Sequence, residues 1–296
     1  MQETNPPFGA DFEQRLEQLL RMSRSTSGTP FRLRSRSKRR GAGFQFSSFR
    51  DYVAGDDFRL IDARASLRLN QLLLRTYEQE DHLPIHVLVD TSSSMGQNGR
   101  RKLNCAKRIA AAIACLAVAA KERVRVIGFS GAELRVQAVS GGRGAWLTIL
   151  RFLEQLEPTG ATRLSLALRR FVNQTPRRGV VMLIGDCLDP EGFEPGLQVL
   201  RYAGFDTQVW HVVDSTDAEI LDTGDITAVD CETGAELSVT VTEGFRQRLR
   251  LAHQRLGDEL ERHCRANHID YSRCNVEVPF ERIVLDGSRA RRSSTT

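Results

Sequence analysis

The feature that most constrains the fold is a short apolar run that ends abruptly in an acid and a row of hydroxyl residues. Residues 85–89 are apolar apart from one histidine and are preceded by Pro84, a composition typical of a buried parallel strand. Asp90 ends the run, and residues 91–94 follow it with four hydroxyl side chains. In open α/β sheets, ligands bind outside the carboxyl ends of the strands. We therefore expect these oxygen groups to lie at a ligand-binding edge.

The acid and two of the hydroxyls form an Asp-x-Ser-x-Ser pattern of Asp90, Ser92 and Ser94. The pattern offers only oxygen donors, and only one of them is charged. Such a set suits a hard divalent cation such as Mg²⁺, whereas Zn²⁺ prefers His or Cys ligands. The competing interpretation is a turn that caps the following helix, and the pattern alone favours neither.

Strand-like and helix-like segments alternate from residue 84 onward. Apolar runs predict strands over 85–90, 124–129, 180–186, 206–213 and 269–276. Helical periodicity predicts helices over 101–121, 145–156, 163–174, 193–203 and 243–267. Two hairpins are also expected, one pairing 124–129 with 133–139 and one centred on 230–234. This alternation predicts an α/β fold with a doubly wound, mostly parallel sheet and one antiparallel edge strand.

Composition places the chain among soluble globular proteins. The chain has 296 residues, of which 41% are hydrophobic and 27% charged, which is ordinary for such proteins. Its six cysteines show no CxxC spacing, so we expect reduced thiols. The first residues lack the order of a signal peptide, and no apolar run is long enough to span a bilayer. These features predict a cytoplasmic protein.

Composition shifts divide the chain into four parts. Residues 1–40 are predicted to be a peripheral segment that ends in a basic arm at 32–40, and residues 41–83 an extension that packs on the core. Residues 84–286 are predicted to form the α/β domain, and residues 287–296 a basic, flexible tail.

The polar loops together resemble the metal-ion-dependent adhesion site of von Willebrand factor A domains. The resemblance is carried by Asp90, Ser92 and Ser94, by Thr162, and by Asp186 after a later strand. It implies that Ser92 and Ser94 bind Mg²⁺ or Mn²⁺ directly, and that Thr162 binds directly or through water. It further implies that Asp90 and Asp186 hold metal-bound waters, and that the cation accepts an Asp or Glu from a partner protein.

Two departures from that site are visible. The threonine loop has Ala161 where the pattern usually has a second glycine, and Asp189 follows Asp186 as a second acid.

The flanking sequence is similar to the bacterial domain-of-unknown-function family numbered fifty-eight. The similarity is carried by the run from Arg50 to Asp62, by residues 65–68 and 78–80, and by residues 224–226 and 230–234. It implies a von Willebrand factor A-like fold and partnership with MoxR-type AAA+ ATPases as an adaptor or scaffold. Ala63 stands where the family usually has Trp. We expect the Arg50 to Asp62 run to form an ion-paired turn that attaches the N-terminal segment to the core, with partner contact as the secondary interpretation.

These motifs contain no poised catalytic base, so we expect a non-enzymatic, metal-dependent interaction module. A rival interpretation is a metal-dependent phosphoester hydrolase that uses Asp186 or Asp189 as its base. A third is a nucleic-acid-associated protein that uses the arm at 32–40, although a solvated arm is the simpler explanation of that run.

Overall fold

The computed structural model describes residues 7–9, 11–25, 40–53, 55–78, 83–140, 144–219 and 223–293. The chain divides into two compact units. Residues 1–33 and 84–296 form the first unit, and residues 34–83 form the second. The predicted basic arm at 32–40 lies outside the described residues except for Arg40.

A six-stranded sheet forms the centre of the first unit. Its strand order is β10-β7-β6-β3-β4-β5, with β3 (Ile85–Asp90), β4 (Arg123–Ser130), β5 (Glu133–Ser140), β6 (Val180–Gly185), β7 (Asp206–Val213) and β10 (Asp270–Asn275). All neighbouring pairs are parallel except β4 and β5, which form an antiparallel hairpin. This order confirms the predicted von Willebrand factor A-like fold with one antiparallel edge strand.

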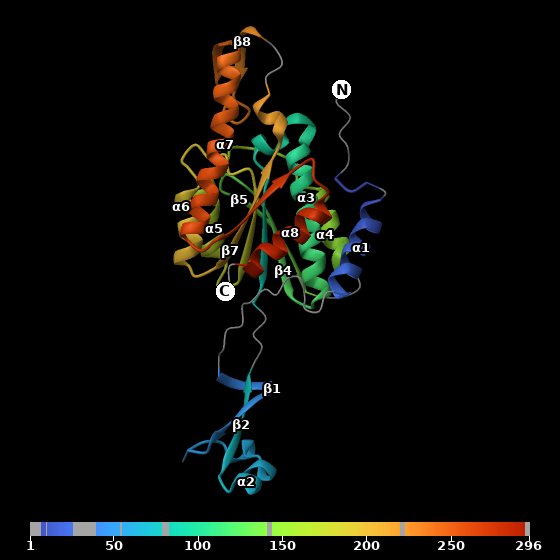
Figure 1. The fold of residues 1–296 in the computed structure, drawn as a ribbon, viewed down its shortest axis with the longest axis vertical. Coiled ribbons are helices and arrows are strands. Elements are labelled where there is room, and N and C mark those ends of the chain that lie inside the picture. The colour runs from blue at the N-terminus through green and yellow to red at the C-terminus, as the bar shows by residue number, and fades with distance from the viewer. Residues whose placement is uncertain are drawn as a thin grey trace. The chain divides into compact units, whose positions relative to one another are not determined.

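Helices cover both faces of this sheet (Figure 1). One face carries α1 (Phe12–Ser25), α3 (Gln97–Ala119), α4 (Ala145–Glu154) and α8 (Phe280–Ser293), and the other carries α5 (Leu164–Gln174), α6 (Glu194–Tyr202) and α7 (Glu243–Ala266). The first residues of α3 after Gln97 have positive φ, so its regular part starts at Arg101 as predicted. The predicted second hairpin is also present, as β8 (Gly224–Val229) and β9 (Glu236–Val241).

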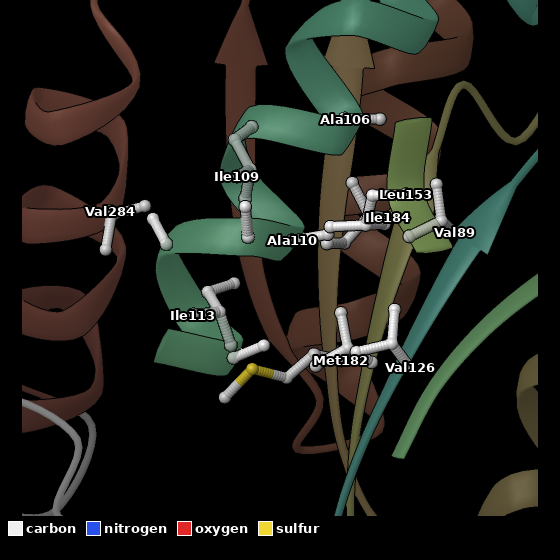
Figure 2. Close-up of a cluster of buried hydrophobic side chains, with 14 of the residues drawn as sticks. Val89, Ala106, Ile109, Ala110, Ile113, Val126, Leu153, Met182, Ile184 and Val284 are labelled. Carbon is white, nitrogen blue, oxygen red and sulfur yellow. The ribbon is translucent and has the colours of Figure 1, made fainter. Parts of the chain in front are cut away.

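The larger of two core clusters lies between α3 and the sheet. Figure 2 shows Ala110 and Ile113 of α3 beside the side chains of Met182 and Ile184, which project from β6. All four side chains are fully buried. The small alanine side chains of α3 let the helix approach the strands closely. The apolar part of this helix is therefore buried in the core.

Both terminal segments of the chain contain a helix. The segment predicted to be peripheral contributes Phe12 and Leu16 of α1 to the main core, where each is 4% exposed. The predicted flexible tail from residue 287 instead continues helix α8 to Ser293. This helix is anchored by the buried side chains of Ile283 and Val284, whereas the prediction rested only on the basic composition beyond them.

The second unit is a small sheet with two short helices. Strand β1 (Arg40–Asp51) pairs antiparallel with β2 (Leu73–Glu78). Between them lie the 3₁₀ helix η1 (Phe58–Leu60) and helix α2 (Ala63–Leu69). The prediction that residues 41–83 pack on the core remains a prediction.

The run from Arg50 to Asp62 contains an ion-paired turn, while its predicted attachment of the N-terminal segment to the core remains a prediction. Both guanidinium nitrogens of Arg50 donate to the Asp56 carboxylate at 2.7 and 2.6 Å, and Asp56 also accepts the Val53 N–H at 2.9 Å. These bonds lower the pKa of Asp56, first through Arg50 and then through Val53. Asp62 caps α2 by accepting the N–H of Ala65 at 3.0 Å. The motif therefore builds the local fold of the second unit.

Among the described residues, no helix combines the length and the apolar character that crossing a membrane would require.

Candidate metal centre

The two predicted acids lie side by side because their strands are neighbours. Strands β3 and β6 are parallel partners, so Asp90 and Asp186 follow them at the same edge of the sheet. A Cβ atom at Gly185 would lie 2.7 Å from the Cβ of Asp90, so this approach needs a glycine. Both carboxylates are 2% exposed.

The loop after β3 turns two serine hydroxyls toward each other. The N–H of Ser92 donates to Asp90 Oδ1 at 2.9 Å, and the Oγ atoms of Ser92 and Ser94 are 2.9 Å apart. Both serines are buried. The serine loop thus contains a local turn at Asp90, but no side chain caps the following helix α3, whose N-cap residue is Gly96.

Backbone hydrogen bonds hold the threonine loop against the serine loop. The N–H of Ser93 donates to the carbonyl of Gly160 at 2.9 Å, and the N–H of Thr159 donates to the carbonyl of Thr91 at 2.8 Å. Gly160 has a φ of 71°, a left-handed conformation that favours glycine. Thr162, which is 2% exposed, follows directly. The structure thus brings the hydroxyl of Thr162 to the same edge as Ser92 and Ser94.

Glu232 also belongs to this cluster, although the sequence predicted it only as part of the family motif at residues 230–234 and not as a site residue. It lies in the turn between β8 and β9. Its Oε1 accepts the hydroxyl of Thr162 at 2.6 Å and its Oε2 accepts the N–H of the same residue at 3.0 Å. A carboxylate from a distant hairpin therefore occupies both donors of the predicted metal-binding threonine.

Lys102 is a second residue of the site that was not predicted from the sequence. Its Nζ lies 2.8 Å from Asp186 Oδ2 and 2.8 Å from Asp217 Oδ2, and its side chain is 3% exposed. Burial alone would lower the pKa of Lys102, but the two carboxylates raise it overall. Lys102 therefore stays charged and neutralises Asp186. No sequence signal distinguished Lys102, because Arg101, Lys107 and Arg108 lie on the same helix.

Asp90 lacks comparable compensation. Burial raises its pKa to about 7, the neighbouring charge of Asp186 adds to the shift, and Glu232 adds a smaller contribution. Hydrogen bonds from Ser92 act in the opposite direction. The hydrogen bonds from Ser92 are therefore too weak to stabilise the charged form of the Asp90 carboxyl. A bound cation would stabilise that charged form.

The extra acid, Asp189, has a structural role. Its Oδ2 accepts the N–H of Leu164 at 2.6 Å and its Oδ1 accepts the N–H of Glu191 at 2.9 Å. Asp189 therefore satisfies the first turn of α5 and does not substitute for Asp186.

The donor set fits a hard cation better than a softer one. In the described part of the chain, no group of three or more His, Cys, Asp or Glu side chains is arranged to hold a metal, so any cation here would depend on hydroxyl ligands. Octahedral Mg²⁺ has ligands at 2.0–2.1 Å, which puts adjacent ligands about 2.9 Å apart. The separation of the Ser92 and Ser94 Oγ atoms matches that spacing.

A cleft of about 560 Å³ opens beside Asp186, at the ends of β7 and β10. Its lining combines acids with the basic side chains of Arg250 and Arg273. Ser92, Ser94 and Thr162 do not line this cleft, so it adjoins the acid and not the hydroxyl groups.

The sheet order and the hydroxyl-rich loops at its edge define a von Willebrand factor A-like domain. A family model described as "Protein of unknown function DUF58" matches residues 48–259. The chain belongs to this family, which confirms the resemblance seen in the sequence.

Relatives from two mycobacteria are similar to this chain. Uncharacterized protein Rv1480 of Mycobacterium tuberculosis and uncharacterized protein Mb1516 of Mycobacterium bovis are each 26% identical to it over 211 residues. The matched region covers 70% of this chain and 66% of each relative, so the chain spans just under two thirds of their length.

Solved structures with some likeness include protein BatB from Bacteroides thetaiotaomicron, at 15% identity and a TM-score of 0.42, covering 72% of this chain and 100% of that one. A von Willebrand factor type A protein from Catenulispora acidiphila has 11% identity and a TM-score of 0.40, covering 72% and 43%. At these values the likeness assigns no function.

Proposed function

We propose that the chain is a non-enzymatic protein-interaction module that depends on Mg²⁺ or Mn²⁺. We further propose that it works with a MoxR-type AAA+ ATPase in a chaperone-like or assembly system, as the family resemblance implies. The observation that supports the metal-dependent module is the buried pair of serine hydroxyls, 2.9 Å apart, beside an undercompensated Asp90.

The residues divide the work between binding and charge balance. Ser92, Ser94 and Thr162 would hold the cation through neutral oxygens, while Asp90 and Asp186 would orient its waters. Held by neutral ligands, the cation would remain electron-poor enough to attract the carboxylate of a partner's Asp or Glu. Lys102 limits the local negative charge by pairing with Asp186.

The contacts of the two acids argue against the hydrolase interpretation. A general base has to be free to accept a proton from the nucleophile. Asp186 is paired with Lys102, and Asp189 accepts two backbone N–H groups. Phosphatase or nuclease turnover that disappears in Asp90→Ala would nevertheless favour the hydrolase.

Affinity purification from the native cell, with Mg²⁺ or with a chelator, tests the proposal. We expect an AAA+ ATPase to be retained with Mg²⁺ and released by the chelator. Ser92→Ala should lose this partner, because it removes a proposed ligand. Ser93→Ala is the matched control in the same loop, since only the backbone N–H of Ser93 contacts the threonine loop. Equal capture by Ser92→Ala, or capture that ignores the chelator, would contradict the proposal.

A further inference from the structure

The turn between β8 and β9 is built to present Glu232. Asp230 Oδ1 accepts the N–H of Glu232 at 2.8 Å and that of Thr233 at 3.3 Å. The N–H of Gly234 donates to the carbonyl of Asp230 at 2.8 Å, and Gly234 has a φ of 72°. These hydrogen bonds within residues 230–234 hold the backbone of the turn, and with it the position of Glu232.

Glu232 reaches the candidate metal centre across 70 residues of sequence. Its two oxygens bond the hydroxyl and the N–H of Thr162. It is also close enough to Asp90 to add to the negative potential there. Among the described residues, no Lys, Arg or His forms an ion pair with Glu232. A half-buried carboxylate thus sits at the hydroxyl cluster without a cationic partner from the described chain.

We propose that Glu232 is an intramolecular carboxylate ligand of the cation, supplied by the β8–β9 hairpin. The inference rests on the proposed function, because it assumes a cation at Ser92 and Ser94. Mg²⁺ sites in proteins usually include one or two carboxylates, and the hydroxyls alone supply none. Glu232 is not paired with Lys102, as Asp186 is, and it is not part of the turn after β3, as Asp90 is. It also does not accept an N–H group of the first turn of α5, as Asp189 does.

This assignment changes how a partner reaches the centre. Glu232 holds the position that a partner's carboxylate needs, so the partner has to replace it. The partner's apparent affinity is then reduced by the fraction of molecules in which Glu232 is bound. The hairpin acts as an internal competitor for the site.

Calorimetric titration of Mg²⁺ into the full chain tests the assignment. Glu232→Gln keeps the size of the side chain and an oxygen that can accept from Thr162, but removes the charge. We expect it to weaken Mg²⁺ binding roughly tenfold or more, as for the loss of a supporting metal contact. Glu236→Gln removes the same charge from an exposed position of the same hairpin, and it should bind like the wild type.

Chemical rescue tests the exchange step. In Glu232→Ala, which leaves space, added acetate should recover part of the lost Mg²⁺ affinity, and it should not do so in Ser92→Ala. Equal affinities of the Glu232→Gln and Glu236→Gln variants would overturn the ligand assignment, and absence of acetate rescue would overturn the exchange. In either case a large loss in Ser92→Ala would leave the proposed function standing. Wild-type affinity in Ser92→Ala would instead remove the metal centre itself.

Discussion

Two polar motifs of this chain carry the family resemblances and behave differently in the structure. In the run from Arg50 to Asp62, the charged groups pair with each other or cap backbone N–H groups, as Arg50 and Asp56 do. At the end of β3, the hydroxyls of Ser92 and Ser94 meet each other, beside an acid whose charge is poorly compensated.

This difference in hydrogen bonding distinguishes a motif that stabilises the local fold from one that we propose binds a ligand. Polar groups that satisfy one another explain their own presence and need no partner from outside. Polar groups that converge while leaving charge uncompensated are expected at binding sites. On this basis we interpret the family motif of the second unit as structural, and we propose that the edge of the large sheet is functional.

The largest expected effect comes from Lys102, whose ammonium group pairs with both Asp186 and Asp217. Lys102→Met leaves the buried carboxylate of Asp186 and the partly buried carboxylate of Asp217 without their cation. We expect the free energy of unfolding to fall by about 3–5 kcal/mol, measured by chemical denaturation in the presence of a chelator. Lys107→Met is the matched control, since its ammonium contacts the backbone carbonyl of Glu154. A loss no larger than that of the control would show that Asp186 does not need Lys102.

His86 tests whether an unsatisfied polar group is enough to mark a site. It lies on β3, and Phe171 and Phe205 contact its ring. Its ring nitrogens have no hydrogen-bond partner among the residues that the structure describes. Burial lowers its pKa from 6.5 to about 4, with a further contribution from Arg125. Its surroundings are apolar, so we interpret it as a core residue and not as a ligand.

The lowered pKa of His86 gives a pH dependence with a definite sign. Between pH 6.5 and 4 the unfolded chain binds a proton at this position that the folded chain does not. Stability is therefore retained above pH 6.5 and falls by about 3 kcal/mol on going to pH 4. His86→Phe should remove this part of the loss in urea denaturation at pH 7, 5 and 4. The exposed His268→Asn is the control, and an unchanged slope in His86→Phe would contradict the interpretation.

The smallest expected effect is at the cap of α2. Asp62→Ala removes the acceptor for the Ala65 N–H and should destabilise the second unit by about 1 kcal/mol. Amide exchange in α2 should accelerate roughly fivefold, while Mg²⁺ affinity stays unchanged. Arg64→Ala, an exposed change in the same helix, should accelerate exchange less. A loss of Mg²⁺ binding in Asp62→Ala would break the distinction between the two motifs.

The strands of the six-stranded sheet, most helices and both hairpins followed from the sequence because periodicity and turn residues are local properties, whereas β1 of the second unit was not predicted. The continuation of α8 did not, because its basic end suggested a tail while Ile283 and Val284 anchor it through distant contacts. The same reason explains the residues that were missed at the site. Lys102 meets Asp186 across 84 residues and Glu232 meets Thr162 across 70, and no local pattern encodes such pairs.

The most direct test of the central claim is calorimetric titration of Mg²⁺ into wild type and Asp90→Ala. We predict one Mg²⁺ site in the wild type that is lost on adding a chelator, and at least a tenfold lower affinity for Mg²⁺ in Asp90→Ala. Asp189→Asn, which changes an acid committed to α5, should bind like the wild type. Equal binding by wild type and Asp90→Ala would contradict the assignment of this edge as a metal centre.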